Sequence, residues 1–128
     1  MITWDKEEGI QIVDDVLNEN ECQALPTVIK IKDTYHMYFC FREATDFRSN
    51  PDRGYQIGYA FSNDLKNWNR NDSLGGFFKS NEANDWDNKM QCYPHIFSIK
   101  SKVYMLYNGN EFGKYGFGIA ELLSDENE

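Results

Sequence analysis

Two stretches of the chain carry apolar and polar residues in the pattern of β-hairpins. Residues 21–42 contain two apolar runs, 28–31 and 35–41, and a polar turn at residues 32–34 separates them. β-Branched and aromatic residues fit a pleated, half-buried surface, and a polar turn between two such runs indicates a hairpin. Residues 91–108 show the same arrangement, so we predict a second hairpin there.

The two hairpins share one residue pattern. Pro26 and Pro94 lie 68 residues apart, and at that offset further residues match: Gln23 with Gln91, Ile31 with Ile99, Lys32 with Lys100, Met37 with Met105, and Phe39 with Tyr107. Each hairpin is followed by another apolar strand, with Gly58-Tyr59-Ala60 in the first copy and Gly118-Ile119-Ala120 in the second. Repeated units of four strands are the signature of a β-propeller.

These units predict an all-β fold of four-stranded antiparallel blades. No segment shows helical periodicity, so we expect no helix longer than about two turns. The single domain then divides into an outer strand of a preceding blade (1–20), a complete blade (21–85) and an incomplete blade (86–123). The first part rests on Trp4-Asp5-Lys6, which resembles Trp68-Asn69-Arg70, and on an expected short strand at residues 10–13.

Composition narrows the functional classes. The formal net charge of −8 argues against a general nucleic-acid partner, because phosphate binding needs a basic surface. No apolar run reaches the roughly 20 residues of a membrane helix, and the first residues lack a signal pattern, so we expect a cytoplasmic protein without a membrane partner. The three cysteines fit no zinc pattern, and we expect reduced, mostly buried thiols and no metal or other cofactor.

The motifs at residues 26–39 and 54–68 resemble the five-bladed propellers of glycoside hydrolase family 43 and its relatives in families 32 and 68. A second, partial match covers residues 94–107 and 116–120. The resemblance implies a carbohydrate-processing scaffold of which this chain holds about two blades. It also implies a central site where one carboxylate acts as a general acid and another as base or nucleophile. The positions just before Pro26 and Pro94, where that family often places its acid, hold no carboxylate here.

The resemblance makes Glu21 the candidate catalytic residue, because it begins the innermost strand of the first complete blade. The alternative for Glu21 is an exposed loop glutamate. Gln23 and Gln91 hold matching positions, and their amides either bind sugar hydroxyls or tie the blades together through backbone groups. His95 is a candidate ligand contact, or a strand histidine with no such role.

Further candidate ligand-binding residues flank the two hairpins. Arg42 at a strand end can bind a carboxylate or a hydroxyl pair, whereas Asp46 and Arg53 lie in the loop that follows. Trp86 either stacks on a sugar ring or fills the gap between blades. The set is completed by two residues on either side of the second hairpin: Asp87 and Asn108.

Three functions fit these residues: part of a glycosidase, a carbohydrate-binding module without chemistry, or a truncated structural product without activity. We expect the chain alone to lack robust glycosidase activity, because the mechanism needs two carboxylates across one sugar. Six aromatic residues are predicted to be too many for one chain of this size to cover: Tyr38, Phe39, Phe41, Tyr59, Tyr104 and Tyr107. We therefore expect a homo-oligomer, in which residues 4–13 of one copy complete the blade that ends at Leu123 of another.

Overall fold

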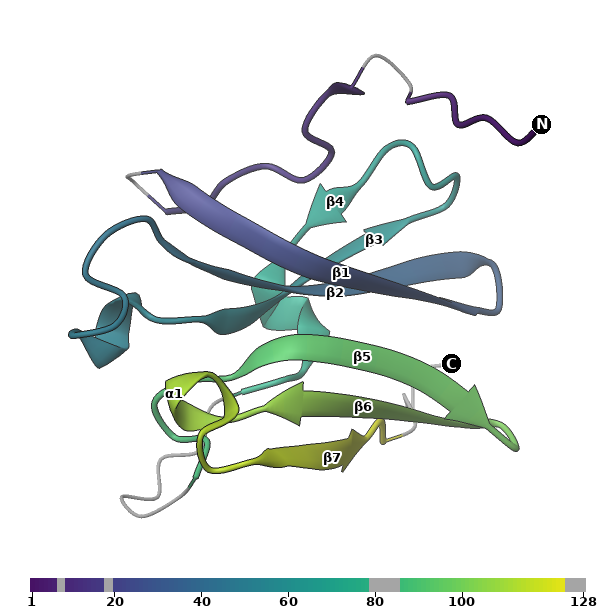
Figure 1. The fold of residues 1–128 in the computed structure, drawn as a ribbon. Helices are drawn as coiled ribbons and strands as arrows, with labels where there is room; N and C mark the ends of the chain where they lie inside the picture. Colours follow the sequence, from purple (N-terminus) through teal and green to yellow (C-terminus); the bar gives the residue numbers. More distant parts are fainter. Residues whose placement is uncertain (7–8, 18–19, 79–85, 124–128) are drawn as a thin grey trace.

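The computed structural model describes residues 1–6, 9–17, 20–78 and 86–123, and it forms two antiparallel sheets (Figure 1). Sheet A has the strand order β1-β2-β3-β4, and sheet B has the order β5-β6-β7. The strands are β1 (Glu21–Ile31), β2 (Thr34–Glu43), β3 (Gln56–Ser62), β4 (Asn69–Arg70), β5 (Cys92–Ile99), β6 (Lys102–Asn108) and β7 (Phe117–Glu121). The predicted all-β class with four antiparallel strands in the first unit and three in the second is confirmed.

Helical segments are short throughout the described residues. Two 3-10 helices, Pro51–Arg53 and Asp72–Gly75, and the four-residue helix α1 (Asn110–Gly113) lie in the connections between strands. This agrees with the expectation of no helix beyond about two turns. None of the helices in the described part of the chain is long and apolar enough to cross a membrane.

The two hairpins share a backbone irregularity at equivalent positions. The pairing of β1 with β2 shifts register between residues 24 and 27, and the pairing of β5 with β6 shifts between residues 92 and 95. Within each bulge the residue before the proline is left-handed: Leu25 has a φ of 51° and Tyr93 a φ of 56°. A bulge bends the strand that carries it, so β1 and β5 change direction at equivalent points along their sheets.

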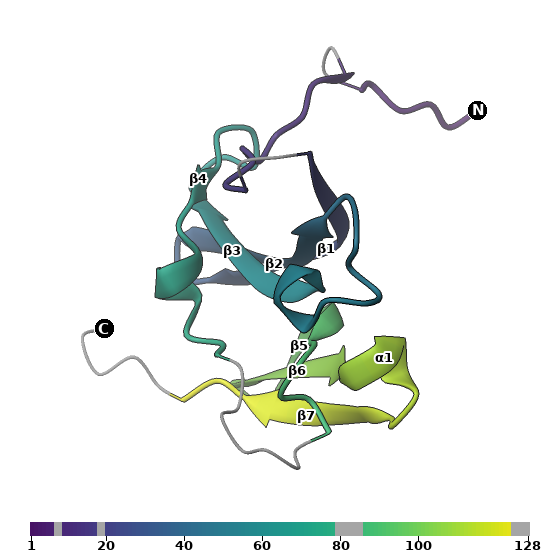
Figure 2. The ribbon, with the colours of Figure 1, turned by 90° about the vertical axis from the view of Figure 1, so that its left-hand side faces the viewer.

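Sheets A and B pack face to face, and β5 lies against β1 and β2 (Figures 1 and 2). The core between the sheets consists of apolar residues from both: Tyr38, Cys40, Tyr55, Ile57, Tyr59, Met90, Cys92, Ile96 and Met105. One hydrogen bond also joins the layers, because the Ile96 N–H donates to Thr27 Oγ1 at 3.2 Å.

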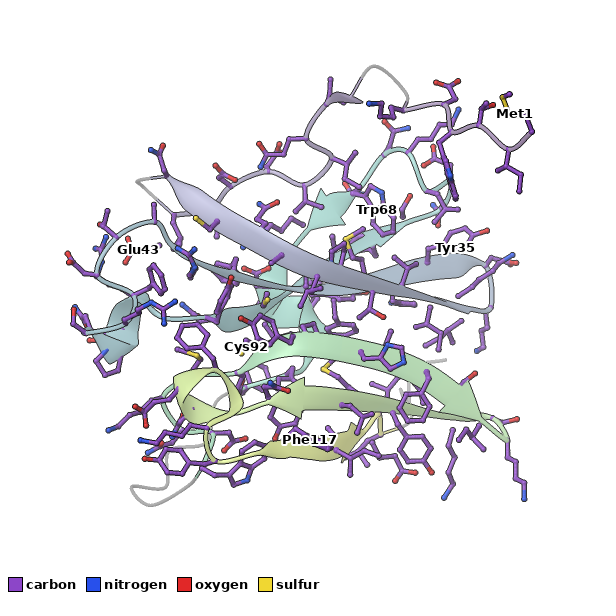
Figure 3. All side chains as sticks on the ribbon, in the orientation of Figure 1. Met1, Tyr35, Glu43, Trp68, Cys92 and Phe117 are labelled. Atoms are coloured by element: carbon purple, nitrogen blue, oxygen red, sulfur yellow. The ribbon has the colours of Figure 1, made fainter. Side chains whose placement is uncertain are left out.

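The cysteines are free thiols, as predicted, and two of them lie in this core. Burial raises the pKa of Cys40 to about 11 and that of Cys92 to about 12. Figure 3 shows Cys92 between the two sheets. Because a thiolate is the reactive form, both side chains serve as small apolar core groups.

The opposite face of sheet A is covered by the N-terminal segment, residues 9–17, which crosses above β1 and β4 (Figure 1). Val13 of this segment is buried against Met37, Phe39 and Phe41. The short strand predicted at residues 10–13 is wrong, because no strand forms there. The segment contacts side chains of sheet A through its backbone and has no neighbouring strand to pair with.

The opposite face of sheet B carries exposed apolar side chains. Figure 3 shows Phe117 on this side of the molecule, and Ile119 and Ile99 are also exposed. Of the six aromatic residues expected not to be covered all together, Tyr104 and Tyr107 are half-buried, and four are buried: Tyr38, Phe39, Phe41 and Tyr59. They are covered because sheet B packs on one face of sheet A and the N-terminal segment on the other.

Candidate functional site

Most of the predicted site residues gather at one end of the two sheets, where β1 and β5 begin and β2 and β6 end. Cross-strand pairing places Glu21 opposite Glu43 and Cys22 opposite Arg42 in sheet A. In sheet B it places Cys92 opposite Asn108. Figure 3 shows Glu43 at this end of sheet A. Because β5 packs on β1, the predicted residues of both sheets share one end of the molecule.

Glu21 lies in a buried ion cluster with Arg70 of β4. Its Oε2 is 2.6 Å from Arg70 Nη1, and the two side chains are 0% and 4% exposed, respectively. The same oxygen accepts a hydrogen bond from Gln23 Nε2 at 2.7 Å. Oε1 accepts the backbone N–H groups of Val16 at 3.1 Å and Leu17 at 3.3 Å. Both carboxylate oxygens are therefore occupied by donors.

These contacts determine the charge state of Glu21. Burial acts to raise the pKa of Glu21, but hydrogen bonds from Gln23, Arg70 and the Val16 N–H, together with the charge of Arg70, hold it below its ordinary value. A general acid in glycoside cleavage needs a raised pKa and access to the sugar. Glu21 instead carries a stable negative charge away from solvent.

Arg70 also binds a second carboxylate, that of Asp72, and its guanidinium lies near two aromatic rings. Its Nε and Nη2 donate to the two oxygens of Asp72, both at 3.1 Å, and Asp72 Oδ1 also accepts the Tyr59 N–H at 3.0 Å. The guanidinium lies 5.0 Å from the ring centre of Phe39 and 4.5 Å from that of Phe41. Arg70 therefore links the outermost strand of sheet A to the first residue of β1.

Gln23 fastens the N-terminal segment to this cluster. Besides Glu21, its Nε2 lies within hydrogen-bonding distance of Asp15 Oδ1 at 3.1 Å and of the Val13 carbonyl at 3.3 Å. Arg70 Nη1 donates to the Asp14 carbonyl at 2.7 Å. Glu21, Gln23 and Arg70 thus hold residues 13–17 on the face of sheet A, and we call these three residues the clamp.

Arg42 lies on the other side of β2, among aromatic rings. Its guanidinium is 3.7 Å from the ring centre of Phe47 and 5.5 Å from that of Tyr55. Nη1 donates to the Glu43 carbonyl at 3.1 Å, while Nε is buried and has no hydrogen-bond partner among the described residues. The ring of Phe112, in α1, packs against both Phe47 and Tyr55.

Arg53 and Asp46 shape the loop between β2 and β3. Arg53 donates from Nε to the Thr45 carbonyl at 2.8 Å and pairs with Glu43 Oε2 at 3.2 Å. Asp46 is left-handed, with a φ of 61°, and its carbonyl accepts the Asn50 N–H at 2.9 Å. Both residues organise the loop that carries Phe47.

Trp86 packs against residues of sheet B and of its connecting loop. Its ring stacks on Tyr107 with centres 5.3 Å apart, and it covers Gly109 and Gly118, where a Cβ atom would come within 2.2 and 2.5 Å of the indole. Asp87 accepts a hydrogen bond from Tyr107 Oη at 2.7 Å. These contacts lie within the second unit, so both roles of Trp86, stacking on a sugar ring and filling the gap between blades, stay predictions.

Each of the three remaining predicted residues makes different contacts. Gln91 is buried, donates to the Phe78 carbonyl at 3.3 Å, and lines a cavity of about 230 Å³. Asn108 donates to the Phe112 carbonyl at 3.3 Å. His95 lies on the exposed face of sheet B, where its ring stacks on Phe97 with centres 5.8 Å apart.

The cavity beside Gln91 combines amide, carboxylate and aromatic groups. Its lining comes from the end of β2, the start of β3 and the segment after β4: Phe41, Gln56, Ile57, Asp72, Ser73, Phe77 and Phe78, with Gln91. Asp72 connects this cavity to the clamp, because Arg70 holds both Asp72 and Glu21.

Sequence reasoning missed Arg70, Asp72 and Gln56. Arg70 lies opposite Ala60 in the β3–β4 pairing, and this small neighbour leaves room for a long side chain to cross the sheet. In the sequence, Arg70 stands between Asn69 and Asn71, so no local pattern distinguishes it. The contact with Glu21, 49 residues away, is set by tertiary structure.

Comparison with known proteins defines what the chain is similar to. No protein-family model matches it. It is 31% identical over 121 residues to uncharacterized proteins of two Mycobacterium tuberculosis strains, CDC 1551 / Oshkosh and ATCC 25618 / H37Rv. The match covers 94% of this chain and 36% of each relative, so the chain spans about a third of the length of the curated relatives it matches.

The fold is similar to that of a solved glycoside hydrolase. The TM-score is 0.60 at 19% sequence identity, and the match covers 88% of this chain and 36% of that chain. At this identity the likeness establishes the fold alone. The fold of the two sheets is thus one that occurs within a glycoside hydrolase.

Proposed function

We propose that the chain forms two adjacent blades of a five-bladed, glycoside-hydrolase-type propeller and recognises a carbohydrate. The shared bulge and left-handed residue before Pro26 and Pro94 support two equivalent blades. The match to 36% of a glycoside hydrolase supports the same division, since two blades of five make up about two fifths of a propeller.

The cavity lined by Gln91 is the observation on which the carbohydrate assignment depends. Gln56, Gln91 and Ser73 offer hydroxyl and amide groups that donate and accept hydrogen bonds, as sugar hydroxyls require. Phe41, Phe77 and Phe78 add apolar surface for a ring face. A volume of about 230 Å³ is below the roughly 300–1,000 Å³ of drug-sized ligand sites and suits a single sugar unit.

Recognition without hydrolysis is the activity we propose for this chain by itself. Glu21, the candidate catalytic residue, is fully covered and held anionic by the clamp. Asp72 is engaged by Arg70 on both of its oxygens. Glu21 and Asp72 thus both pair with one arginine, and neither is poised to protonate a glycosidic oxygen.

A glycan array followed by calorimetry with the best ligand tests the proposal. We expect binding that falls by about tenfold or more in Gln91→Ala, because a buried polar partner of the sugar is removed. Lys30→Ala, at an exposed position of β1 away from the cavity, serves as the matched control. Binding that is equal in wild type and Gln91→Ala would contradict this site.

A second candidate function is hydrolysis by a longer assembly that contains these two blades. It is favoured by the 36% coverage of the glycoside hydrolase, because further blades would supply further carboxylates. A panel of aryl glycosides distinguishes the two. Turnover by the purified chain that disappears in Glu21→Gln would replace recognition by catalysis as its function.

A further inference from the structure

The most exposed aromatic side chain near the N-terminus is that of Trp4, at 88% exposure. Tryptophan buries a large apolar surface when it is covered, so an exposed one is a candidate anchor for contact with another molecule. The residues that follow it, Asp5 and Lys6, match the pattern after Trp68. Trp68, in contrast, is seated within sheet A.

Trp68 packs on the outer part of sheet A, and we call the apolar surface that it covers its seat. Trp68 packs against the cluster that contains Met37 and Ala60. The next two residues form β4, in which Arg70 lies opposite Ala60 and Asn69 lies opposite Phe61 of β3. Sheet A is therefore completed by Trp68, which packs on its face, and by β4, its two-residue fourth strand.

Sheet B has the equivalent apolar surface, and among the described residues no tryptophan covers it. Met105 and Ala120 are the counterparts of Met37 and Ala60 at the sequence offsets of 68 and 60 residues. Both line an apolar cavity of about 330 Å³, together with Tyr38, Phe77 and Leu122. Within the described residues, β7 pairs with β6 alone and has no strand on its outer edge.

We propose that a second copy of this chain fills this seat, with its Trp4 in the cavity and the following residues paired with the edge of β7. Addition of a strand to a free sheet edge satisfies its backbone groups, while the indole supplies the apolar anchor. In the register of sheet A, Lys6 then lies opposite Ala120 and Asp5 opposite Glu121. This proposal goes beyond carbohydrate recognition, and its failure would leave that proposal unchanged.

The occupant is a second copy because the N-terminal segment is held on the far side of sheet A. The clamp fixes residues 13–17 there, and sheet A separates them from the cavity between the sheets (Figures 1 and 2). Two copies that exchange Trp4 reciprocally give a closed dimer, and one-way exchange gives a ring or a filament.

Sedimentation equilibrium of the full chain over a range of concentrations tests the proposal. We expect a mass above 15.0 kDa at tens of micromolar, and a dissociation constant raised by about tenfold or more in Trp4→Ala. Leu74→Ala, also an exposed large apolar residue, is the matched control and should leave association unchanged. Wild type that stays monomeric, or Trp4→Ala that associates like wild type, would overturn the proposal.

A complementation experiment then identifies the seat. Ala120→Phe fills the cavity while leaving Trp4 intact, and Trp4→Ala leaves the cavity intact. We expect each variant alone to be monomeric and the mixture to form a one-to-one complex. Circular dichroism checks that both are folded, and Leu122→Lys at the rim is a second seat variant if Ala120→Phe unfolds. Mixtures that remain monomeric while wild type associates would overturn the assignment of this cavity.

Discussion

Sheets A and B each contain a hairpin of the same residue pattern, but the faces of the two sheets have different surroundings. Sheet A is covered on both faces, by sheet B and by residues 9–17, and its aromatic residues Tyr38, Phe39 and Phe41 are buried. Sheet B is covered on one face, and Phe117 is 72% exposed on the other. The same local pattern therefore produces a sheet covered on both faces in one place and a sheet with an exposed apolar face in the other.

Charged residues account for much of this difference. The counterpart of Glu21 in sheet B, at the offset of 68 residues, is Lys89, so the clamp cannot form there. The strand that carries Arg70 in sheet A has no equivalent among the described residues of sheet B. A carboxylate at the start of β1 and an arginine across the sheet thus allow the N-terminal segment to cover sheet A.

The largest expected effect follows from removal of Arg70. Arg70→Leu leaves Glu21 buried without its cation, which typically costs about 3–5 kcal/mol of unfolding free energy. Urea unfolding measures the loss. Arg53→Leu is the control, because its pair with Glu43 is more than 20% exposed on both sides and should cost below about 1 kcal/mol. Equal losses in the two variants would show that the clamp contributes no more than a surface pair.

A smaller effect is expected at Gly118, the counterpart of Gly58. A Cβ atom there would lie 2.5 Å from Trp86 Cζ2, and overpacking of this kind costs about 1–3 kcal/mol. Gly118→Ala should therefore lower the unfolding free energy in wild type and have little effect in a Trp86→Ala background. Thermal unfolding of the four proteins measures this coupling. Equal losses in both backgrounds would exclude Trp86 as the cause.

The clamp also predicts a pH dependence of stability. The pKa of Glu21 in the folded protein lies below its ordinary value of 4.5, so the unfolded chain binds this proton more readily. The stabilisation is complete above that ordinary value and is lost as the pH falls through the lowered folded value. The difference in unfolding free energy between wild type and Glu21→Gln should therefore shrink in acid. A difference that is constant from neutral pH into the acid range would contradict the assigned charge state.

Local sequence signals predicted the strands well, and tertiary contacts explain what they missed. The polar turn at residues 32–34 lies between two apolar runs, and this pattern alone marks the first hairpin. The strand expected at residues 10–13 has apolar residues but no partner strand, and side chains of sheet A take its hydrogen bonds.

The candidate site likewise contains residues that local sequence patterns predict and residues that only tertiary contacts bring together. Gln91 could be predicted from its match with Gln23, whereas Gln56 and Asp72 come to the same cavity only through folding. Glu21 was recognised as a special position from its place at the strand start. Its partner Arg70 depends on how β4 returns to the sheet, which no local pattern specifies.

The smallest expected effect is at the ion pair of Lys102 and Glu121, which is exposed, whereas the ion pair of the clamp is buried. Their charged atoms are 3.5 Å apart, and the side chains are 66% and 42% exposed. Water screens such a pair and its long side chains lose entropy, so exposed pairs contribute roughly 0–1 kcal/mol. Lys102→Ala should lower the unfolding free energy by less than about 0.5 kcal/mol, and salt should reduce this loss further. A loss above about 1 kcal/mol would show that water does not screen this pair as it screens an exposed one.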